Sequence, residues 1–194
     1  MATIQDEAER LNRFVGNLLD MTRIESGVQL KSDRIDVAEV VETALRRAAR
    51  VLSRHRIEVT LAPDLPMLYA DAVLVEQVLF NLLDNASRHA PPGSLIAIAA
   101  QPHGTMVRLT VADEGEGIAP GELEAIFEKF YRARAGDQRV AGTGLGLAIC
   151  RGFVEAFGGT ITAGNRTDRP GAIFTILLPS GGIATPASAR AALS

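Results

Sequence analysis

The sequence predicts an α+β fold: a two-layer α/β sandwich preceded by one long coiled-coil-type helix. Helical and strand periodicities follow one another along the chain, and pairs of strands flank short turns. The 194 residues are 47% apolar and 22% charged, which suits one core with a small appendage. We therefore assign residues 1–30 to a helical segment, 31–179 to one domain and 180–194 to a disordered tail.

The first helix is predicted over residues 3–26, where mainly apolar positions recur at alternating spacings of four and three residues. These heptad positions are Ile4, Ala8, Leu11, Val15, Leu18 and Thr22. One helix cannot bury such a stripe by itself, so we expect a partner helix or a dimer mate to cover it. Ser26-Gly27 ends the pattern.

A second helix begins after Asp36, which forms a capping-box-like pair with Glu39. Its predicted apolar face consists of Val37, Val40, Val41, Ala44, Leu45 and Ala48. Asp71 caps a helix that we expect to continue to about His89. Two further helices are predicted at residues 122–130 and 144–157.

The strands are predicted from two-residue alternation between turn signals. They cover residues 56–61, 67–70, 95–100, 106–113, 160–164 and 172–178. The third and fourth strands flank the turn Pro102-His103-Gly104, and the last two flank residues 166–170, so each pair forms an antiparallel hairpin.

Composition and single residues exclude several classes of function. A net charge of −3 argues against broad nucleic-acid binding. The chain has two lysines, Lys31 and Lys129, and neither follows the glycine-rich run of a P-loop. Cys150 is the only cysteine, so we expect no disulfide or cysteine zinc site and place this residue in the core. No apolar run is long enough to span a membrane and no signal peptide is visible, so we expect this segment to be soluble.

The helix after Asp71 is expected to carry a polar stripe about 80° wide opposite its apolar face. The stripe consists of Gln77, Asn81, Asn85 and Arg88. An amide oxygen is a hard, neutral ligand that suits Mg²⁺, and a guanidinium one turn onward can pair with a phosphate oxygen. The alternative is that Asn81 and Asn85 only decorate a solvated helix face. Asparagine disfavours helix interiors, so two on one stripe are unusual.

Asp113 is expected to end a strand on its buried face. Val107, Leu109, Val111 and Asp113 share parity, and the first three are apolar. A buried carboxylate needs hydrogen bonds, and it can accept one from the exocyclic amine of adenine. Gly115 and Gly117 allow a close approach to a flat ring. The alternative is a turn initiator before Gly115.

The run Gly142-Thr143-Gly144-Leu145-Gly146-Leu147 precedes a helix, whose free amides attract phosphate. It departs from the G-x-G-x-x-G pattern of dinucleotide-binding folds and follows a polar loop instead of a strand. That loop carries Arg132, Arg134 and Arg139, which can close over a triphosphate as a lid or simply be solvated at the surface.

Phe127 and Phe130 lie at helical spacing, and we interpret them as core packing that anchors the lid. His55 and His103 receive no role. His89 ends the helix with the amide stripe, and lining the nucleotide site and having no role remain equally open for it.

Four stretches in this order resemble the N, G1, F and G2 boxes of bacterial sensor histidine kinases. They are Asn81-Leu82-Leu83-Asp84-Asn85, Asp113-Glu114-Gly115-Glu116-Gly117, Phe127-Glu128-Lys129-Phe130 and Gly142-Thr143-Gly144-Leu145-Gly146-Leu147. The ATP-binding domain of these kinases belongs to the group shared with DNA gyrase, the mismatch-repair MutL ATPase and Hsp90-type chaperones. The resemblance covers about residues 3–178. Residues 18–27 look like part of the second helix of the dimerisation and phosphotransfer hairpin, and residues 144–151 and 158–163 are similar to potassium-responsive Kdp sensor kinases.

The resemblance implies ATP as phosphodonor, Mg²⁺ as cofactor and a site built from the four boxes. Asn85 matches the metal ligand, and Asn81 and Arg88 match residues that assist catalysis. The residues that it implies for nucleotide binding are Asn81, Asn85, Arg88, His89, Asp113, Gly115, Gly117, Ile118, Phe130, Arg132, Gly142, Thr143, Gly144, Leu145, Gly146 and Leu147.

The resemblance further implies a two-component sensor kinase that passes the ATP γ-phosphoryl group to a histidine and then to an aspartate of a response regulator. The expected partners are that regulator and the phosphoacceptor helix of the same parent chain or its dimer mate. The expected location is the cytoplasmic side of a parent anchored in the bacterial inner membrane. No His-Glu-x-x-Thr-Pro run exists here, so we expect the acceptor histidine to lie N-terminal to Met1 in the parent.

Two alternatives stay open at this stage. One is a nucleotide-sensing or phosphatase-type binding module without efficient phosphotransfer. The other is a same-fold enzyme of another class, such as a serine kinase or an ATPase clamp. The heptad helix at residues 3–26 favours the histidine kinase, because those relatives do not need such a stalk.

Overall fold

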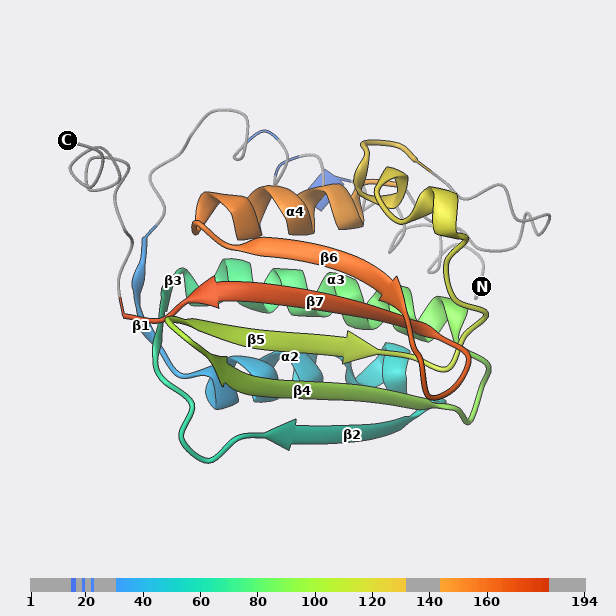
Figure 1. Ribbon diagram of the computed structural model, residues 1–194, viewed down its shortest axis with the longest axis horizontal. Coiled ribbons are helices and arrows are strands. Elements are labelled where there is room, and N and C mark those ends of the chain that lie inside the picture. The colour runs from blue at the N-terminus through green and yellow to red at the C-terminus, as the bar shows by residue number, and fades with distance from the viewer. Residues whose placement is uncertain (1–14, 17–18, 20–21, 23–30, 132–143, 182–194) are drawn as a thin grey trace.

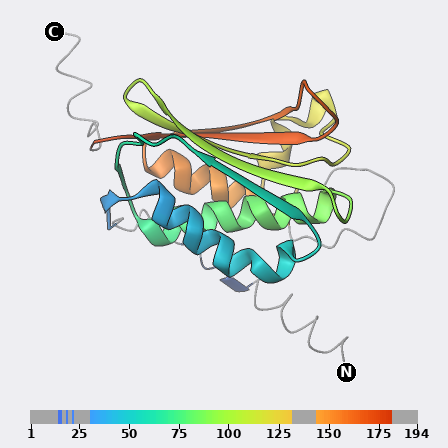
Figure 2. The same cartoon turned by 90° about the horizontal axis from the view of Figure 1, so that it is seen from below.

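The computed structural model describes residues 15, 16, 19, 22, 31–131 and 144–181 (Figure 1). The rest of the predicted helix at residues 3–26, and the predicted tail beyond residue 181, lie outside the described residues. Helices α2, α3 and α4 cover one face of a five-stranded sheet, so the predicted two-layer α/β sandwich is confirmed (Figures 1 and 2).

Helix α2 (Val37–Leu52) begins where the capping signal predicted. The Asp36 side chain accepts a hydrogen bond from the Ala38 N–H at 2.7 Å, which satisfies one of the free amides of the first turn. The buried side of α2 consists of Val37, Val40, Val41, Ala44, Ala48 and Leu52. Leu45 is partly buried against the same core, so the predicted apolar face is confirmed.

Helix α3 (Ala72–His89) is capped by Asp71, whose carboxylate accepts hydrogen bonds from Val73 N at 3.0 Å and Leu74 N at 3.4 Å. Its buried face consists of Val75, Val78, Leu79, Leu82, Leu83 and Ala86. The other face carries the predicted polar stripe. Helix α3 lies between α2 and α4 (Figure 2), and the residues of the stripe are half-buried.

The large sheet has the strand order β2-β4-β5-β7-β6 (Figure 1). The strands are β2 (Arg56–Leu61), β4 (Leu95–His103), β5 (Met106–Ala112), β6 (Thr160–Asn165) and β7 (Ala172–Pro179). Strands β4 and β5, and β6 and β7, form the two predicted antiparallel hairpins. Strand β4 extends through Pro102 and His103, which moves its turn to Gly104 and Thr105.

Two features of the sheets differ from the prediction. Strand β2 pairs parallel with β4, whereas only antiparallel pairs were expected; the chain between them includes α3, and such a crossover permits parallel pairing. A short strand, β1 (Asp33–Ile35), was missed and pairs antiparallel with β3 (Leu68–Ala70) in a separate two-stranded sheet. Two of its three residues, Asp33 and Arg34, are charged and exposed, so the sequence carries no strand signal there.

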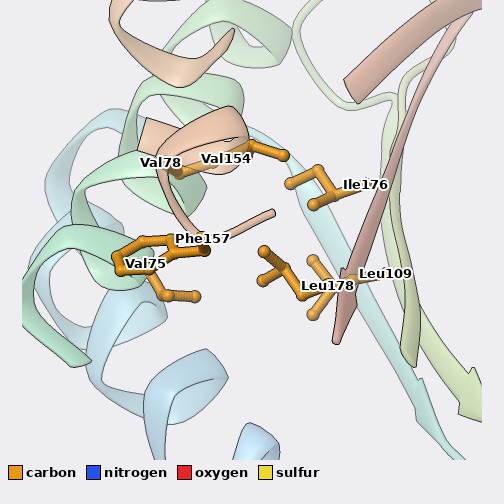
Figure 3. Close-up of a pocket in the computed structure, with 7 residues that line it drawn as sticks. All are labelled: Val75, Val78, Leu109, Val154, Phe157, Ile176 and Leu178. Atoms are coloured by element: carbon orange, nitrogen blue, oxygen red, sulfur yellow. The ribbon is translucent and has the colours of Figure 1, made fainter. Parts of the chain in front are cut away.

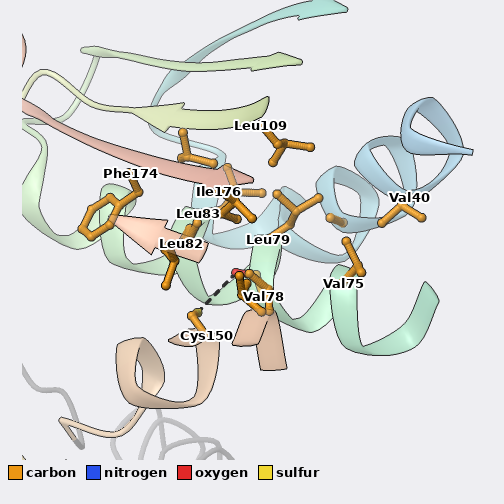
Figure 4. Packing of buried hydrophobic residues seen from close by; sticks show 14 of the residues in the cluster. Val40, Val75, Val78, Leu79, Leu82, Leu83, Leu109, Cys150, Phe174 and Ile176 are labelled. Atoms are coloured by element: carbon orange, nitrogen blue, oxygen red, sulfur yellow. Dashed lines mark hydrogen bonds between the residues drawn. The ribbon is translucent and has the colours of Figure 1, made fainter. Parts of the chain in front are cut away.

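The core fills the space between the helices and the sheet (Figure 4). Leu79, Leu82 and Leu83 of α3 are 0–1% exposed and face strands β5 and β7. Each such side chain contributes roughly 1.5–3 kcal/mol through removal from water. Cys150 of α4 is fully buried as predicted, and its thiol donates to the Val78 carbonyl at 3.6 Å. Burial raises the pKa of this thiol to about 12.

The helix predicted at residues 122–130 is not an α-helix. Two short 3₁₀ helices, η1 (Pro120–Glu122) and η2 (Ala125–Phe127), occupy this stretch, and the backbone becomes extended at Glu128. Phe127 is buried and packs edge to face on Phe174 with ring centroids 6.3 Å apart.

Phe130 does not join this packing. Its side chain is 64% exposed and its φ is 63°. The prediction that both phenylalanines pack in the core is right for Phe127 and wrong for Phe130, because the chain leaves the helical path between them.

Helix α4 (Gly146–Ala156) begins two residues after the predicted start at Gly144 and ends against Gly158 and Gly159, as the glycine pair predicted. No helix in residues 31–131 or 144–181 is long and apolar enough to cross a lipid bilayer.

Candidate functional site

Asn81 connects α3 to the start of α4. Its Nδ2 donates to the Gly146 carbonyl at 3.4 Å, and its Oδ1 accepts from Gln77 Nε2 at 3.3 Å. The two predicted nucleotide motifs that contain Asn81 and Gly146 therefore meet, although 65 residues separate them in the chain. The N-cap residue of α4 is Leu145, whose own side chain makes no capping hydrogen bond to the amides of the first turn.

Asn85 lies one turn further along α3 and is partly buried. Its amide makes no hydrogen bond to any residue that the structure describes. A half-buried amide without a protein partner is available to bind an oxygen ligand or a cation. Within the described ranges, no cluster of three or more His, Cys, Asp or Glu side chains is placed to hold a metal ion by itself.

Arg88 is engaged by its own helix. Its Nε and Nη2 donate to the two carboxylate oxygens of Asp84 at 2.9 and 3.1 Å. This i, i+4 pair is partly buried, with the two side chains 26% and 19% exposed. The pair fixes the direction of the guanidinium, and a phosphate would have to share Arg88 with Asp84. The pairing of Asp84 with Arg88 was not predicted, although the spacing of four residues is visible in the sequence.

Asp113 follows β5 and is 2% exposed, as its parity with Val111 predicted. Its Oδ1 accepts hydrogen bonds from Gly115 N at 2.8 Å and Ala172 N at 3.2 Å. Its Oδ2 accepts no hydrogen bond from the described part of the chain. The carboxylate is thus held by main-chain amides on one oxygen, and the other is available for a donor from a ligand.

Gly115 lies against the end of α3. A Cβ atom at this position would be 2.6 Å from the His89 carbonyl oxygen and 3.0 Å from Asp113 Oδ1, so only glycine fits. Part of the His89 side chain is exposed, yet the surrounding protein desolvates the ring and lowers its pKa. Arg88 lowers the pKa further, while the charges of Asp113 and Glu116 oppose the shift. The structure therefore brings His89 close to the Asp113 turn, and a role of His89 in lining the nucleotide site stays a prediction.

Ile118 is held by a side chain that the sequence did not single out. Asn165, the last residue of β6, accepts from Ile118 N through Oδ1 and donates to Ile118 O through Nδ2, both at 2.7 Å. Gly117 has a φ of 83°, and a Cβ there would be 2.6 Å from Asn165 Oδ1. An asparagine at the end of a strand gives no signal of this contact in the sequence.

Phe130 and Gly144 meet at the two ends of the segment that the structure leaves undescribed. Phe130 N donates to the Gly144 carbonyl at 2.9 Å, and Gly144 has a φ of 70°. Leu145 is buried, while Gly146 and Leu147 open α4. Arg132, Gly142 and Thr143, together with the lid arginines Arg134 and Arg139, lie outside the described residues, so their predicted roles stay predictions.

A small cavity elsewhere is a packing defect of the core and not part of this site (Figure 3). It has a volume of about 10 Å³ and lies between α3, α4 and the sheet. It is lined by Val75, Val78, Leu109, Val154, Phe157, Ile176 and Leu178. An apolar space of this size holds about one water molecule at most and offers it no hydrogen bond. None of the predicted site residues lines it.

The arrangement places the predicted site along one face of α3. Asn81 contacts the start of α4, Asn85 follows one turn on, and His89 ends the helix beside Gly115 and Asp113. One helical turn is about 5.4 Å, so this stripe extends over roughly two turns. A ligand with a flat polar ring at one end and a chain of anionic groups at the other would match this order of groups.

The family described as "Histidine kinase-, DNA gyrase B-, and HSP90-like ATPase" matches residues 70–182, which contain every predicted site residue. The chain belongs to this family of ATPases.

Among individual relatives, the chain is 41% identical over 179 residues to the sensor protein KdpD of Clostridium acetobutylicum, covering 91% of this chain and 20% of that protein. It is 42% identical over 177 residues to KdpD of Escherichia coli, with the same coverage. It is 34% identical over 182 residues to the signal transduction histidine-protein kinase/phosphatase MprB of Mycolicibacterium paratuberculosis, covering 92% of this chain and 34% of that protein. The chain thus spans about a fifth of the KdpD proteins and a third of MprB.

Solved structures of sensor histidine kinases share the fold. The mycobacterial sensor histidine kinase MprB superposes with a TM-score of 0.69 at 30% identity, over 78% of this chain and 99% of that one. Full-length ShkA in complex with AMPPNP gives a TM-score of 0.80 at 25% identity, over 95% of this chain and 39% of that one.

Proposed function

We propose that this chain is the ATP-binding catalytic domain of a two-component sensor histidine kinase. The observation that carries the proposal is Asp113, a buried carboxylate with one oxygen satisfied by main-chain amides and the other without a partner among the described residues. It lies next to Gly115 and His89, where a planar base can approach the backbone. In this proposal Asp113 accepts a hydrogen bond from the exocyclic amine of adenine.

The phosphate end of the nucleotide is assigned to Asn81, Asn85, Arg88 and the start of α4. The N-terminal amides of α4, which the side chain of its N-cap residue Leu145 does not cap, favour an anion, and Asn81 holds the first turn against α3. Arg88 adds a positive charge whose direction is fixed by Asp84. These groups would offset the charge that spreads over the phosphoryl oxygens during transfer.

Mg²⁺ fits the site through Asn85. Its amide oxygen has no protein partner among the described residues, and Mg²⁺ keeps several waters and takes its remaining ligands from phosphates. When bound, the ion would supply positive charge that offsets the negative charge of the nucleotide. Asn85 would contribute one neutral ligand and would fix the position of the ion relative to α3.

The proposed reaction is transfer of the γ-phosphoryl group from ATP to a histidine of the parent protein or its dimer mate, and from there to an aspartate of a response regulator. The relatives named as sensor proteins and histidine-protein kinases support this assignment, and so does a solved ThkA structure in complex with the response regulator TrrA. We extend it to a parent anchored in the bacterial inner membrane. The two KdpD relatives favour a Kdp-type parent, and potassium sensing is the proposed input.

The experiment that tests the base assignment is calorimetric titration with a non-hydrolysable ATP analogue on wild type and Asp113→Asn. A hydrogen bond to a charged acceptor contributes roughly 1.5–3 kcal/mol, so we expect the dissociation constant to rise about tenfold or more in the variant. Asp64→Asn is the matched control, because Asp64 is exposed and has no hydrogen bond in the described part of the chain. Equal affinities of Asp113→Asn and wild type would refute the base assignment.

The metal assignment is tested separately with Asn85→Ala. We expect wild-type affinity for the analogue to increase with Mg²⁺, because Asn85 would hold the ion at the phosphate end of the site. In Asn85→Ala this increase should shrink by roughly fivefold or more, which corresponds to about 1 kcal/mol or more. The readout is the ratio of dissociation constants with and without Mg²⁺. The same ratio in both proteins would remove Asn85 as the ligand.

A second candidate function is dephosphorylation of the regulator, with nucleotide acting as a signal. The MprB relatives, whose name includes both kinase and phosphatase, favour this candidate. An incubation of the chain with γ-labelled ATP and a separate acceptor hairpin distinguishes the two candidate functions. Label on the hairpin histidine supports the kinase, whereas nucleotide binding without label favours the phosphatase role.

A further inference from the structure

We propose that Asn165 is a positioning residue for the base end of the nucleotide site, which fixes the turn from Gly115 to Ile118 beside Asp113. The proposal rests on the proposed function, because it names a residue that would shape the same site. Asn165 does not belong to any of the four predicted boxes, and it lies about 50 residues after the turn that it holds.

The Asn165 side chain makes the pair of hydrogen bonds to Ile118 that a neighbouring strand would otherwise make. Its amide accepts from Ile118 N and donates to Ile118 O, both at 2.7 Å. Ile118 lies in none of the strands, so this side chain satisfies both of its main-chain polar groups. A single rigid amide therefore fixes the position and the orientation of the peptide groups at Ile118.

The close approach of Asn165 also explains why the residue before Ile118 is glycine. Gly117 has a φ of 83°, and a Cβ at this position would be 2.6 Å from Asn165 Oδ1. Gly117 thus leaves the space in which the Asn165 amide reaches Ile118. The Ile118 side chain packs against the edge of the core, so the turn is held by the core on one side and by Asn165 on the other.

Asn165 is connected to Asp113 through adjacent strands. In the register of β6 and β7, Asn165 is paired with Ala172. Ala172 N donates to Asp113 Oδ1 at 3.2 Å, and Asp113 N donates to the Ala172 carbonyl at 3.0 Å. Asp113 and Asn165 are therefore both anchored to Ala172 of β7. The sheet thus fixes their positions relative to each other.

The loop that follows Asn165 is held by contacts other than the Asn165 amide. Arg166 N donates to the Gly171 carbonyl at 2.9 Å, which closes the β6–β7 hairpin. The Arg166 guanidinium pairs with both Asp168 oxygens at 3.0 and 2.8 Å. Arg169 then links Asp168 to Glu114. These contacts hold the loop, and the Asn165 amide makes its hydrogen bonds to Ile118 instead.

The test compares Asn165→Ala, Asn165→Asp and the control Thr167→Ala by titration of the intact chain with ATP and ITP, without acceptor. Thr167 is exposed in the same loop and makes no hydrogen bond to a described residue. Losing two hydrogen bonds that orient the turn should raise the dissociation constant for ATP about tenfold in Asn165→Ala, and at least as much in Asn165→Asp, whose second oxygen would face the Ile118 carbonyl. Thr167→Ala should bind as wild type does.

Two readouts separate positioning from a general structural role. ITP lacks the exocyclic amine proposed to reach Asp113, so its weaker binding should change less than ATP binding in the Asn165 variants. Asp113→Asn and Asn165→Ala should also be non-additive in a double-mutant cycle for ATP, because both act on the same contact. Equal losses for ATP and ITP with full additivity would overturn the inference, as would wild-type ATP affinity in both Asn165 variants. Failure of the wild-type chain to bind ATP would instead overturn the proposed function itself.

Discussion

At the scale of single residues, close backbone packing around Asp113 leaves no room for another side chain at position 115. A Cβ on residue 115 would lie 2.6 Å from the main-chain oxygen of His89, which cannot move without shifting the end of α3. It would also lie 3.0 Å from Asp113 Oδ1, the oxygen that Gly115 N itself holds at 2.8 Å. The smallest substitution therefore disturbs the carboxylate and the helix end together.

We predict that Gly115→Ala weakens binding of an ATP analogue at least tenfold and lowers the free energy of unfolding by about 1–3 kcal/mol, the usual cost of overpacking. Calorimetric titration and chemical denaturation measure the two effects. Gly121→Ala is the matched control, because nothing lies within 4 Å of a Cβ at that exposed position. Wild-type affinity in Gly115→Ala would show that this turn does not border the nucleotide.

The burial of Asp113 could be predicted from the sequence, whereas its hydrogen-bond partners could not. Strand parity placed its side chain on the buried face, and the structure confirms this. Its partner Ala172 and the neighbouring clamp Asn165 come from the β6–β7 hairpin, more than 50 residues later. Local periodicity carries no information on such long-range contacts. The pair Asp84–Arg88 differs, since its i, i+4 spacing was local and could have been recognised.

At the scale of elements, α3 carries both the largest share of the predicted site and a strong start signal. Asp71 accepts from two main-chain amides of the first turn, Val73 N and Leu74 N. These amides have no partner within the helix, so the cap satisfies groups that would otherwise depend on water. The N-terminal carboxylate also interacts favourably with the helix dipole.

We predict that Asp71→Ala lowers the free energy of unfolding by roughly 1 kcal/mol, within the 0.5–2 kcal/mol typical of lost N-caps. Urea denaturation followed by circular dichroism provides the measurement. Asp64→Ala removes an exposed carboxylate just upstream that caps no helix, and we expect it to change stability by less than about 0.5 kcal/mol. Equal stability of Asp71→Ala and wild type would contradict the assigned role of the cap.

Helices with a clear start or stop signal were predicted within a few residues, and the predicted helix without either was not. Helices α2 and α3 begin after aspartate caps and match the prediction. The stretch from residue 122 to 130 has helical spacing of Phe127 and Phe130 but no capping side chain, and it forms short 3₁₀ turns instead. Apolar spacing alone could not distinguish a continuous helix from a chain that turns away after Phe127.

At the scale of the whole molecule, the order of elements was enough to predict two layers, but not how the strands join. Hairpins were visible because a short turn forces antiparallel neighbours. The parallel pairing of β2 with β4 depends on the return of the chain across α3, which no local pattern specifies. The architecture could therefore be predicted, while the sheet order β2-β4-β5-β7-β6 needed the structure.

Three distant parts of the chain meet at Glu114. Its Oε2 accepts from Leu95 N at the start of β4, and its Oε1 pairs with Arg169 of the β6–β7 loop, both at 2.8 Å. The Leu95 amide, followed by Arg169, lowers the pKa of the Glu114 carboxyl below its ordinary value of 4.5. The folded protein therefore binds fewer protons at this group than the unfolded chain does.

This shift makes global stability depend on acid in a defined window. The contribution of ionised Glu114 is fully present above about pH 4.5 and is lost as the pH falls through the lower pKa of the folded state. We predict that Glu114→Gln is less stable than wild type at pH 7 and that the difference narrows as the pH falls below about 4.5. Denaturation midpoints measured between pH 3 and 7 give the two curves.

Titration of His89 does not interfere with this measurement, because its lowered pKa changes stability in a higher pH range. A histidine whose folded pKa lies below 6.5 reduces stability as the pH falls through about 6.5, and Glu114→Gln retains that decline. Glu116→Gln controls for removal of a nearby charge, since Glu116 is exposed and makes no hydrogen bond to the described residues. Parallel curves for Glu114→Gln and wild type below pH 4.5 would mean that the contacts with Leu95 and Arg169 do not stabilise the ionised carboxylate in solution.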